Sequence, residues 1–423
     1  EIKPGSDSEV LLHLIEDYYQ GELKQAVKKV MPFLDGMYAF AVTDGHALVL
    51  ARDPIGKKPV YYTPTFPFAF VSEPKALNGQ ARKLKRLKPG EILEVKDGKI
   101  RTTLGYRIER PQIQIDDSEE AIAAYATAID RSIAKRTHGL DRGAVLFSGG
   151  VDSVFVAQLL KHAGLSVTGY CSGLEEATDV QHAMQAAQEM DIPLRIAFLT
   201  EDLVDGVLAD VIAAIELNGM VQVEAAIPMY LAAKMASEDG HKIMFTGQAA
   251  DELFAGYPWY GTVVRDEGYL ALHHKMWHDI DQLYLDTLER EDRMTMVHSL
   301  ELRAPYLDRE VIRTAMQISP RQKIKGPEDP YRKLVHRELA LRRSVPEFIA
   351  YRKKARAQDG TKVQSLLQIL AEKYFKGRTI PTELELTDYG SNYRYLKEEY
   401  GTQELAAYLA EISKPHNIIV PSV

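Results

Sequence analysis

Residues 145–154 read Val-Leu-Phe-Ser-Gly-Gly-Val-Asp-Ser-Val, an apolar run that ends at two glycines and continues as a helix-like sequence. The run predicts a buried strand, a tight turn and then a helix. Gly149 and Gly150 allow the backbone to approach an anion without a Cβ in the way. The N-terminus of the helix adds N–H groups and partial positive charge, and Ser148 and Ser153 add hydroxyl donors. The stretch therefore indicates a phosphate-binding loop, with a plain glycine-rich turn as the structural alternative.

An acidic residue stands inside this loop, at Asp152. A carboxylate repels phosphate, so its expected role is to hold Mg²⁺ between itself and phosphate oxygens. The other common phosphate loop, Gly-x4-Gly-Lys-Ser/Thr, requires a lysine that is missing from this stretch.

Downstream of Pro111, strand-like and helix-length segments alternate. This alternation predicts a doubly wound parallel sheet, an α/β arrangement. From Tyr257 onward nearly everything is expected to be helical, and the sequence beyond about Arg378 fits no single element. We expect strands at 144–147, 167–171, 193–198 and 242–245, and helices at 119–135, from 151, and at 179–189.

A second strand end carries similar chemistry. Residues 245–257 read Phe-Thr-Gly-Gln-Ala-Ala-Asp-Glu-Leu-Phe-Ala-Gly-Tyr. Both loops should open at the carboxyl edge of a parallel sheet, where ligands bind. Asp152 and Asp251 could therefore face one Mg²⁺–pyrophosphate unit. Helix capping by Asp251 and Glu252 is the structural alternative.

The first part of the chain has a different texture, with short β-rich runs separated by turns and one helix expected at 7–19. It predicts the back part of an antiparallel, sheet-rich α+β domain. We place the domain boundary near residue 110, giving domains at 1–110 and 111–423. The expected strands lie within 37–42, 47–51, 59–62, 68–71 and 91–95.

The composition excludes several classes of protein. The chain has 423 residues, 45% of them apolar, and a single cysteine, so a disulfide framework or a cysteine-rich metal site is excluded. Cys171 is expected to pack in a buried strand. A net charge of −8 and the lack of a long apolar run argue against nucleic-acid binding and a membrane span, and favour a cytoplasmic protein. The basic segment 321–356 predicts either a solvated helix face or an anion site.

The glycine-rich loop resembles the pyrophosphate loop of the N-type ATP pyrophosphatases, which cleave ATP between its α and β phosphates. Together with the segments at 299–308 and 351–360, the chain resembles the glutamine-dependent asparagine synthetases. The resemblance extends over the first domain, which looks like the later part of that family's glutaminase domain, an N-terminal-nucleophile fold. The matching segments there are 5–10, 35–40, 52–62 and 72–75.

The resemblance implies a role for each matched position. Lys354 would steady negative charge as a carboxylate attacks the α-phosphorus, although it could be one more solvated lysine. Asp7 would bind the amino group of glutamine, or only cap a helix. Asp152 and Asp251 would bind Mg²⁺ and take part in catalysis. The implied ATP- and pyrophosphate-binding residues are Phe147, Ser148, Gly149, Gly150, Asp152, Ser153, Ser172, Thr246 and Gly247.

Two positions depart from that family's pattern. Its glutaminase nucleophile is an N-terminal cysteine, whereas this chain begins at Glu1. We therefore expect the front of that domain to lie outside the chain, which as given should not hydrolyse glutamine. The family commonly has Glu where this chain has Gln248, and an amide cannot take a proton from ammonia.

The implied activity is a carbon–nitrogen ligase. ATP and aspartate would form β-aspartyl-AMP and pyrophosphate, and ammonia derived from glutamine would displace AMP. The alternatives are a related amide- or lactam-forming ligase for another carboxylic acid, and a non-catalytic nucleotide-binding protein. The resemblance also suggests a homodimer.

Overall fold

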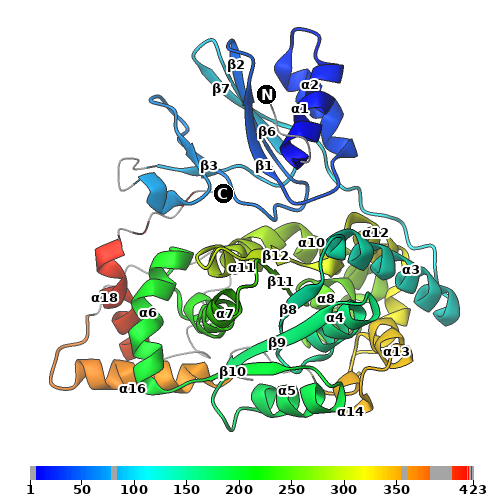
Figure 1. The fold of residues 1–423 in the computed structure, drawn as a ribbon, viewed down its shortest axis with the longest axis vertical. Coiled ribbons are helices and arrows are strands. Elements are labelled where there is room, and N and C mark those ends of the chain that lie inside the picture. The colour runs from blue at the N-terminus through cyan, green and yellow to red at the C-terminus, as the bar shows by residue number, and fades with distance from the viewer. Residues whose placement is uncertain are drawn as a thin grey trace. The chain divides into compact units, whose positions relative to one another are not determined.

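A computed structural model describes residues 6–77, 83–353, 361–381 and 403–416, together with 418 and 421. The chain divides into two compact units (Figure 1). Unit 1 consists of Glu1–Glu109 and Asn417–Val423, and unit 2 consists of Arg110–His416. Each unit is described by itself below.

Unit 1 is built on antiparallel strands. Its described residues form a four-stranded sheet in the order β1-β2-β6-β7 and a three-stranded sheet in the order β4-β3-β5. The elements are α1 (Asp7–Tyr18), α2 (Leu23–Val30), β1 (Ala39–Thr43), β2 (Ala47–Arg52), β3 (Tyr61–Tyr62), β4 (Phe70–Val71), β5 (Lys85–Arg86), β6 (Glu91–Lys96) and β7 (Lys99–Leu104).

Alternation along β2 divides its side chains between two apolar clusters. Val49 and Ala51 pack with α1 and α2, whereas Leu50 packs with Val60 and Leu93. This is the two-faced burial that period-two alternation produces. The turn after β2 is held by the buried carboxylate of Asp53, which accepts hydrogen bonds from four successive backbone N–H groups at 55–58.

Helix α2 was not expected from the sequence, which indicated one helix in this part of the chain. Its buried residues recur at helical spacing, since Leu23, Ala26, Val27 and Val30 all lie on one face. The helix has only eight residues, so its pattern is short and easily overlooked.

Unit 2 is centred on a parallel sheet. Within the described residues it has five strands in the order β10-β9-β8-β11-β12, and every neighbouring pair is parallel. The strands are β8 (Arg142–Leu146), β9 (Ser166–Gly173), β10 (Leu194–Phe198), β11 (Ile243–Phe245) and β12 (Glu301–Arg303). The expected parallel sheet is therefore confirmed. Strand β12 is a correction, because its residues fall in the region expected to be helical.

Helices cover the sheet. In Figure 1, α4 and α5 lie on one side of the sheet and α7 on the other. The longer helices of unit 2 are α3 (Ser118–Thr137), α4 (Val151–His162), α5 (Thr178–Glu189), α6 (Glu201–Ile215), α7 (Met220–Glu238), α9 (Trp259–Glu267), α10 (Tyr269–Leu283), α11 (Glu289–Met296), α12 (Arg309–Gln317), α13 (Leu334–Arg342), α16 (Val363–Phe375) and α18 (Gln403–Ser413). The short ones are α8 (Ala250–Leu253) and α14 (Glu347–Ala350). None of the helices in the described ranges is both long and apolar enough to cross a bilayer.

The strand order reverses direction at β8. The chain moves outward through β9 to β10, then returns to place β11 on the other side of β8. Strands β8 and β11 are direct neighbours, with Val145 paired to Phe245. Ligands of open α/β sheets bind beyond the carboxyl ends of the strands at such a reversal. The two glycine-containing loops start at this point.

Candidate active site

The first loop, residues 148–150, is closed by its own serines. The backbone N–H of Ser148 donates to Oγ of Ser153 at 3.2 Å, and the two hydroxyl oxygens lie 3.2 Å apart. The Ser153 hydroxyl donates in turn to the carbonyl of Gly150. Gly150 is the N-cap of α4 and makes no side-chain cap, so the first N–H groups of this helix are directed at the loop.

Two glycines are required by close backbone approach. Gly149 has φ +68°, and a Cβ there would lie 2.5 Å from the backbone nitrogen of Ala183 in α5. A Cβ on Gly247 would lie 2.8 Å from the carbonyl carbon of Asp152. Gly247 is thus the contact through which the second loop reaches the start of α4.

The second loop brings a carboxylate to the same place. Ala249 has φ +79°, a left-handed conformation that is uncommon for a residue with a Cβ and typical of functional turns. Helix α8 follows and presents Asp251. A Cβ on Gly256 would lie 2.0 Å from Oδ1 of Asp251, so only glycine fits beside that carboxylate.

Lys333 lies between the two aspartates and contacts both. Its ammonium nitrogen is 2.8 and 2.7 Å from the carboxylate oxygens of Asp152 and 2.7 Å from Oδ1 of Asp251. The Lys333 side chain is 1% exposed. A compact cation therefore already bridges both carboxylates in a nearly dry position.

Asp152 is held from two further directions. The Tyr306 hydroxyl donates to the Asp152 carbonyl at 2.9 Å, and Nε2 of His336 lies 3.2 Å from its Oδ1. Nδ1 of His336 lies 2.9 Å from the hydroxyl oxygen of Tyr125. Burial lowers the pKa of His336, which favours its neutral imidazole.

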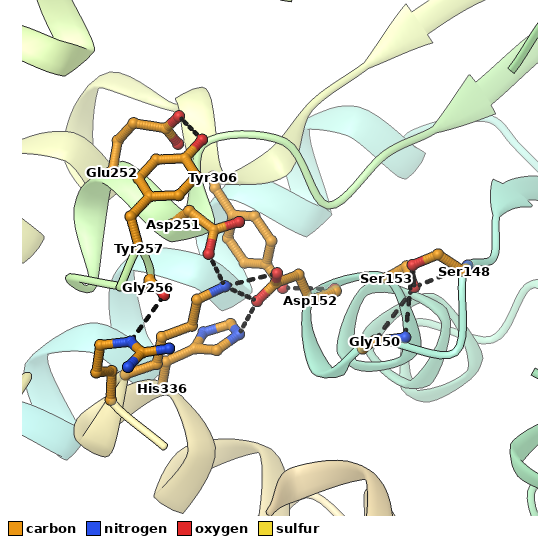
Figure 2. Close-up of polar contacts among 12 residues, drawn as sticks. Ser148, Gly150, Asp152, Ser153, Asp251, Glu252, Gly256, Tyr257, Tyr306 and His336 are labelled. Atoms are coloured by element: carbon orange, nitrogen blue, oxygen red, sulfur yellow. Dashed lines mark hydrogen bonds and ion pairs between the residues drawn. The ribbon is translucent and has the colours of Figure 1, made fainter. Parts of the chain in front are cut away.

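Glu252 stands beside Asp251 but faces a different partner. Its Oε1 accepts a hydrogen bond from the Tyr257 hydroxyl at 2.6 Å, as Figure 2 shows. Burial, and next the nearby Asp251 carboxylate, raise the pKa of Glu252 to about 7. The N-cap residue of α8 is Ala249, which provides no side-chain cap, and Asp251 and Glu252 follow in the first turn of the helix.

Gln248 is engaged through its amide. Its Nε2 donates to the Thr287 hydroxyl at 3.1 Å, in the π-helical turn Tyr284–Leu288. The amide therefore meets a hydroxyl at a position where the resemblance implied a carboxylate.

The other expected site residues take varied positions. Phe147, Ser172 and Thr246 are buried, and the Ser172 hydroxyl has no hydrogen-bond partner among the described residues. Asp7 is exposed at the start of α1, where Ser6 is the N-cap and the Asp7 carboxylate accepts from the Ser8 N–H. Lys354 lies outside the described residues.

Cys171 is buried and free, as expected from its strand. Burial raises the pKa of its thiol to about 12, so at neutral pH it is an inert thiol.

The basic segment 321–356 is solvated only in part, since Arg321, Lys325, Arg342 and Lys353 are exposed. Lys323, Arg332, Lys333 and Arg337 are all buried, and burial lowers the pKa values of Arg332 and Arg337. Sequence reasoning did not single out Lys333 or His336 as site residues. The only signal for them was the excess of basic residues in an acidic chain.

The donors present fit a magnesium ion. Asp152 and Asp251 converge on one atom, the Lys333 nitrogen, so both could bind a single cation. No group of three or more His, Cys, Asp or Glu in the described part of the chain could hold a metal ion. Two carboxylates with substrate phosphates and water are, however, a common Mg²⁺ ligand set.

Comparisons with known proteins agree with this geometry. The asparagine synthase family model matches residues 124–270 and 262–407, and the glutamine amidotransferase domain model matches residues 1–79. A chain from Methanocaldococcus jannaschii, provisionally named glutamine-hydrolyzing asparagine synthetase 1, is 32% identical over 88% of this chain and 76% of its own length. The glutamine-hydrolyzing asparagine synthetase of Sandersonia aurantiaca is 28% identical over 85% of this chain and 69% of its own.

Solved structures are more distant. NMN synthetase from Francisella tularensis aligns with a TM-score of 0.32 and 12% identity, covering 73% of this chain and 98% of that chain. A score this low carries no argument about the fold. The family models and relatives do decide the family, and the chain belongs to the asparagine synthase family.

Proposed function

We propose that this chain is a glutamine-dependent asparagine synthetase that cleaves ATP between its α and β phosphates. The β-carboxylate of aspartate attacks the α-phosphorus, the bond to the bridging oxygen breaks, and pyrophosphate leaves. Ammonia then attacks the acyl carbon of β-aspartyl-AMP, AMP leaves, and the surplus proton is lost to a base or water. The products are asparagine, AMP and pyrophosphate.

The observation that carries this proposal is the meeting of two loops at neighbouring strand ends. The glycine-rich loop after β8 and the acidic loop after β11 touch through Gly247 and Asp152. Their carboxylates converge on Lys333 within 2.8 Å. Such an edge combines anion-binding N–H groups with ligands for a cation, as pyrophosphate with Mg²⁺ requires.

In this proposal the loop and its neighbours bind the nucleotide. The loop N–H groups and serine hydroxyls bind the pyrophosphate, and Gly247 lets the second loop approach. Lys333 neutralises charge on the leaving group. Phe147, Ser172, Thr246 and Gly247 would contact the nucleotide, and Ser148, Gly149, Gly150, Asp152 and Ser153 would bind the diphosphate.

Asp152 and Asp251 would hold Mg²⁺, which when bound supplies charge neutralisation at phosphate oxygens. Lys354 would steady the charge that develops at the α-phosphorus, a contribution of about 3–4 kcal/mol for a preorganised group. The orphan buried hydroxyl of Ser172, at the end of β9, supports the nucleotide assignment, because a ligand could supply its missing partner.

We infer that unit 1 belongs to a glutaminase domain of the N-terminal-nucleophile type. Support comes from its antiparallel sheets and from the glutamine amidotransferase model over residues 1–79. Asp7 would bind the amino group of glutamine, a proposal supported by the exposure of its carboxylate at the start of α1. A cytoplasmic location and a homodimer are further predictions from the family.

The experiment that tests the proposal is exchange of labelled pyrophosphate into ATP. It should require both aspartate and Mg²⁺, because only a reversible adenylation of the acid returns label to ATP. Exchange that is absent with every acid tested, while the protein binds ATP, would make it a nucleotide-binding protein instead.

One observation favours a second candidate. Gln248 donates to Thr287 and has no carboxylate with which to accept a proton from ammonia. A ligase for another carboxylic acid would need a different residue here. Measuring AMP release with a panel of carboxylic acids separates the two, since strong preference for an acid other than aspartate would replace the first candidate.

A further inference from the structure

Arg352 contacts the glycine-rich loop from its carbonyl side. Its Nη1 donates to the carbonyl of Gly149 at 3.0 Å and lies 3.5 Å from the carbonyl of Ser148. Its Nη2 pairs with Oδ1 of Asp179 in α5. Both side chains of the Arg352–Asp179 pair are 10% exposed, so the pair is well shielded from solvent.

The peptide plane explains why these contacts matter. Within one trans peptide unit the C=O and the following N–H point in opposite directions. Arg352 binds the carbonyl of Gly149, so the N–H of Gly150 must point away from the guanidinium. That N–H in fact lies 3.4 Å from the Ser148 hydroxyl, on the side where the loop serines gather. The same argument applies to the Ser148 carbonyl and the Gly149 N–H.

Asp179 fixes the orientation of the Arg352 guanidinium that contacts the loop carbonyls. It belongs to the first turn of α5, and the backbone of that helix is the surface against which Gly149 packs. A Cβ on Gly149 would lie 2.9 Å from the Asp179 carbonyl oxygen. Helix α5 thus contacts the loop twice, once through bare backbone at Gly149 and once through the Asp179–Arg352 pair.

We propose that Arg352, locked by Asp179, is a positioning residue that aims the N–H groups of Gly149 and Gly150 at the diphosphate. Arg352 acts through the loop peptides rather than by touching the ligand. This inference rests on the proposed function in one respect, that the loop binds the diphosphate of ATP. A planar two-nitrogen donor is required, because a lysine carries the charge but cannot reach a carbonyl and a carboxylate in fixed directions.

The test measures binding of magnesium pyrophosphate by calorimetry to the full chain and four variants. Arg352→Lys keeps the positive charge but cannot donate to the Gly149 carbonyl and the Asp179 carboxylate in two fixed directions. Asp179→Asn keeps Arg352 but weakens the ion pair that orients it. Arg343→Lys and Asp130→Asn are matched controls, since Arg343 and Asp130 form an exposed pair 2.6 Å apart in the same unit. Circular dichroism and thermal unfolding confirm that each variant is folded.

We expect Arg352→Lys and Asp179→Asn each to weaken pyrophosphate binding by about tenfold or more, because small misplacements of a positioned group cost this much. The controls should stay within about twofold of the wild type. In the exchange assay, KM for ATP should rise in the two variants while KM for aspartate stays unchanged. The double variant should bind no worse than Arg352→Lys alone, because both changes break one interaction.

The outcomes separate this inference from the proposed function. A wild type that binds pyrophosphate, with folded Arg352 and Asp179 variants that bind it equally well, overturns the inference alone. Equal rises in the KM values for ATP and aspartate overturn it as well, since they indicate a general structural role. A folded wild type that binds neither pyrophosphate nor ATP overturns both. Should Arg352→Lys not fold, Asp179→Asn decides by the same criteria.

Discussion

The ammonium nitrogen of Lys333 lies 2.8 and 2.7 Å from the two carboxylate oxygens of Asp152. Because Asp251 is equally close to the same nitrogen, one buried cation keeps two like charges together. The two carboxylates repel each other, and removing the Lys333 ammonium would leave that repulsion uncompensated. A second cation that binds together with the nucleotide would be attracted to the same two carboxylates.

Replacing Lys333 by Met should destabilise the fold. Breaking a buried ion pair by removing one partner costs about 3–5 kcal/mol, since the remaining charges are uncompensated. In urea unfolding with EDTA we expect a loss of this order, part of which Mg²⁺ restores. The matched control is the double variant Lys333→Met with Asp152→Asn, which removes one of the repelling charges. A double variant less stable than Lys333→Met alone would contradict this account of the charges.

Replacing Asp152 by Asn should greatly reduce adenylation while the fold is retained. The amide keeps the size of the side chain but loses the charge that would hold Mg²⁺, and one such preorganised group contributes about 3–4 kcal/mol. We expect aspartate-dependent pyrophosphate exchange to fall by at least about a hundredfold. Normal exchange in a folded Asp152→Asn protein would remove the metal assignment.

Replacing Gly149 by Ala should impair the loop for two reasons that a control can separate. Gly149 and Gly164 both have positive φ, +68° and +88°, but only at Gly149 would a Cβ meet backbone, 2.5 Å away. Each substitution incurs the left-handed penalty of about 1–2 kcal/mol. Gly149→Ala should also lower pyrophosphate exchange by about tenfold or more, whereas Gly164→Ala should leave the exchange rate unchanged. Equal activities would show that the close approach to α5 is unimportant.

Lys323 predicts a pH-dependent stability. Its side chain is fully buried, its amine has no hydrogen-bond partner among the described residues, and burial lowers its pKa from 10.5 to about 7. Between pH 7 and 10.5 the unfolded chain therefore binds the extra proton, so the free energy of unfolding rises with pH. Lys323→Met should be most stabilising, relative to wild type, at or below about pH 7, and its advantage should shrink as the pH rises.

Urea unfolding of wild type and Lys323→Met at pH 6.5 and pH 9 measures this difference. The exposed neighbour Lys325 provides the control, because Lys325→Met should change stability by less than about 0.5 kcal/mol at either pH. A stability gain in Lys323→Met that does not depend on pH would contradict the lowered pKa.

Local pattern sufficed for the elements that hold the two loops. The apolar run before Ser148 and the glycines after it fixed the end of β8, and the alternation of segments indicated parallel strands. The two loops were expected at one edge of the sheet, and the pairing of Val145 with Phe245 shows that β8 and β11 are direct neighbours. These features are encoded within short windows of sequence.

Contacts between distant segments could not be predicted in this way. Lys333 is 181 residues from Asp152 along the chain, and its exposure depends on how α13 packs. In the sequence Lys333 is one of many basic residues, and the residues around it do not distinguish a buried lysine from a solvated one. Strand β12 was not predicted because it has only three residues. Its strand conformation is defined by pairing with β11, which is distant in the sequence.

The proposed function requires that ATP is cleaved between its α and β phosphates at the two loops that follow neighbouring strands. The most direct test is to incubate the protein with ATP, aspartate, ammonium and Mg²⁺ and to identify the phosphorus products by NMR. We predict AMP and pyrophosphate in equal amounts, together with asparagine. Formation of ADP and orthophosphate would contradict the account.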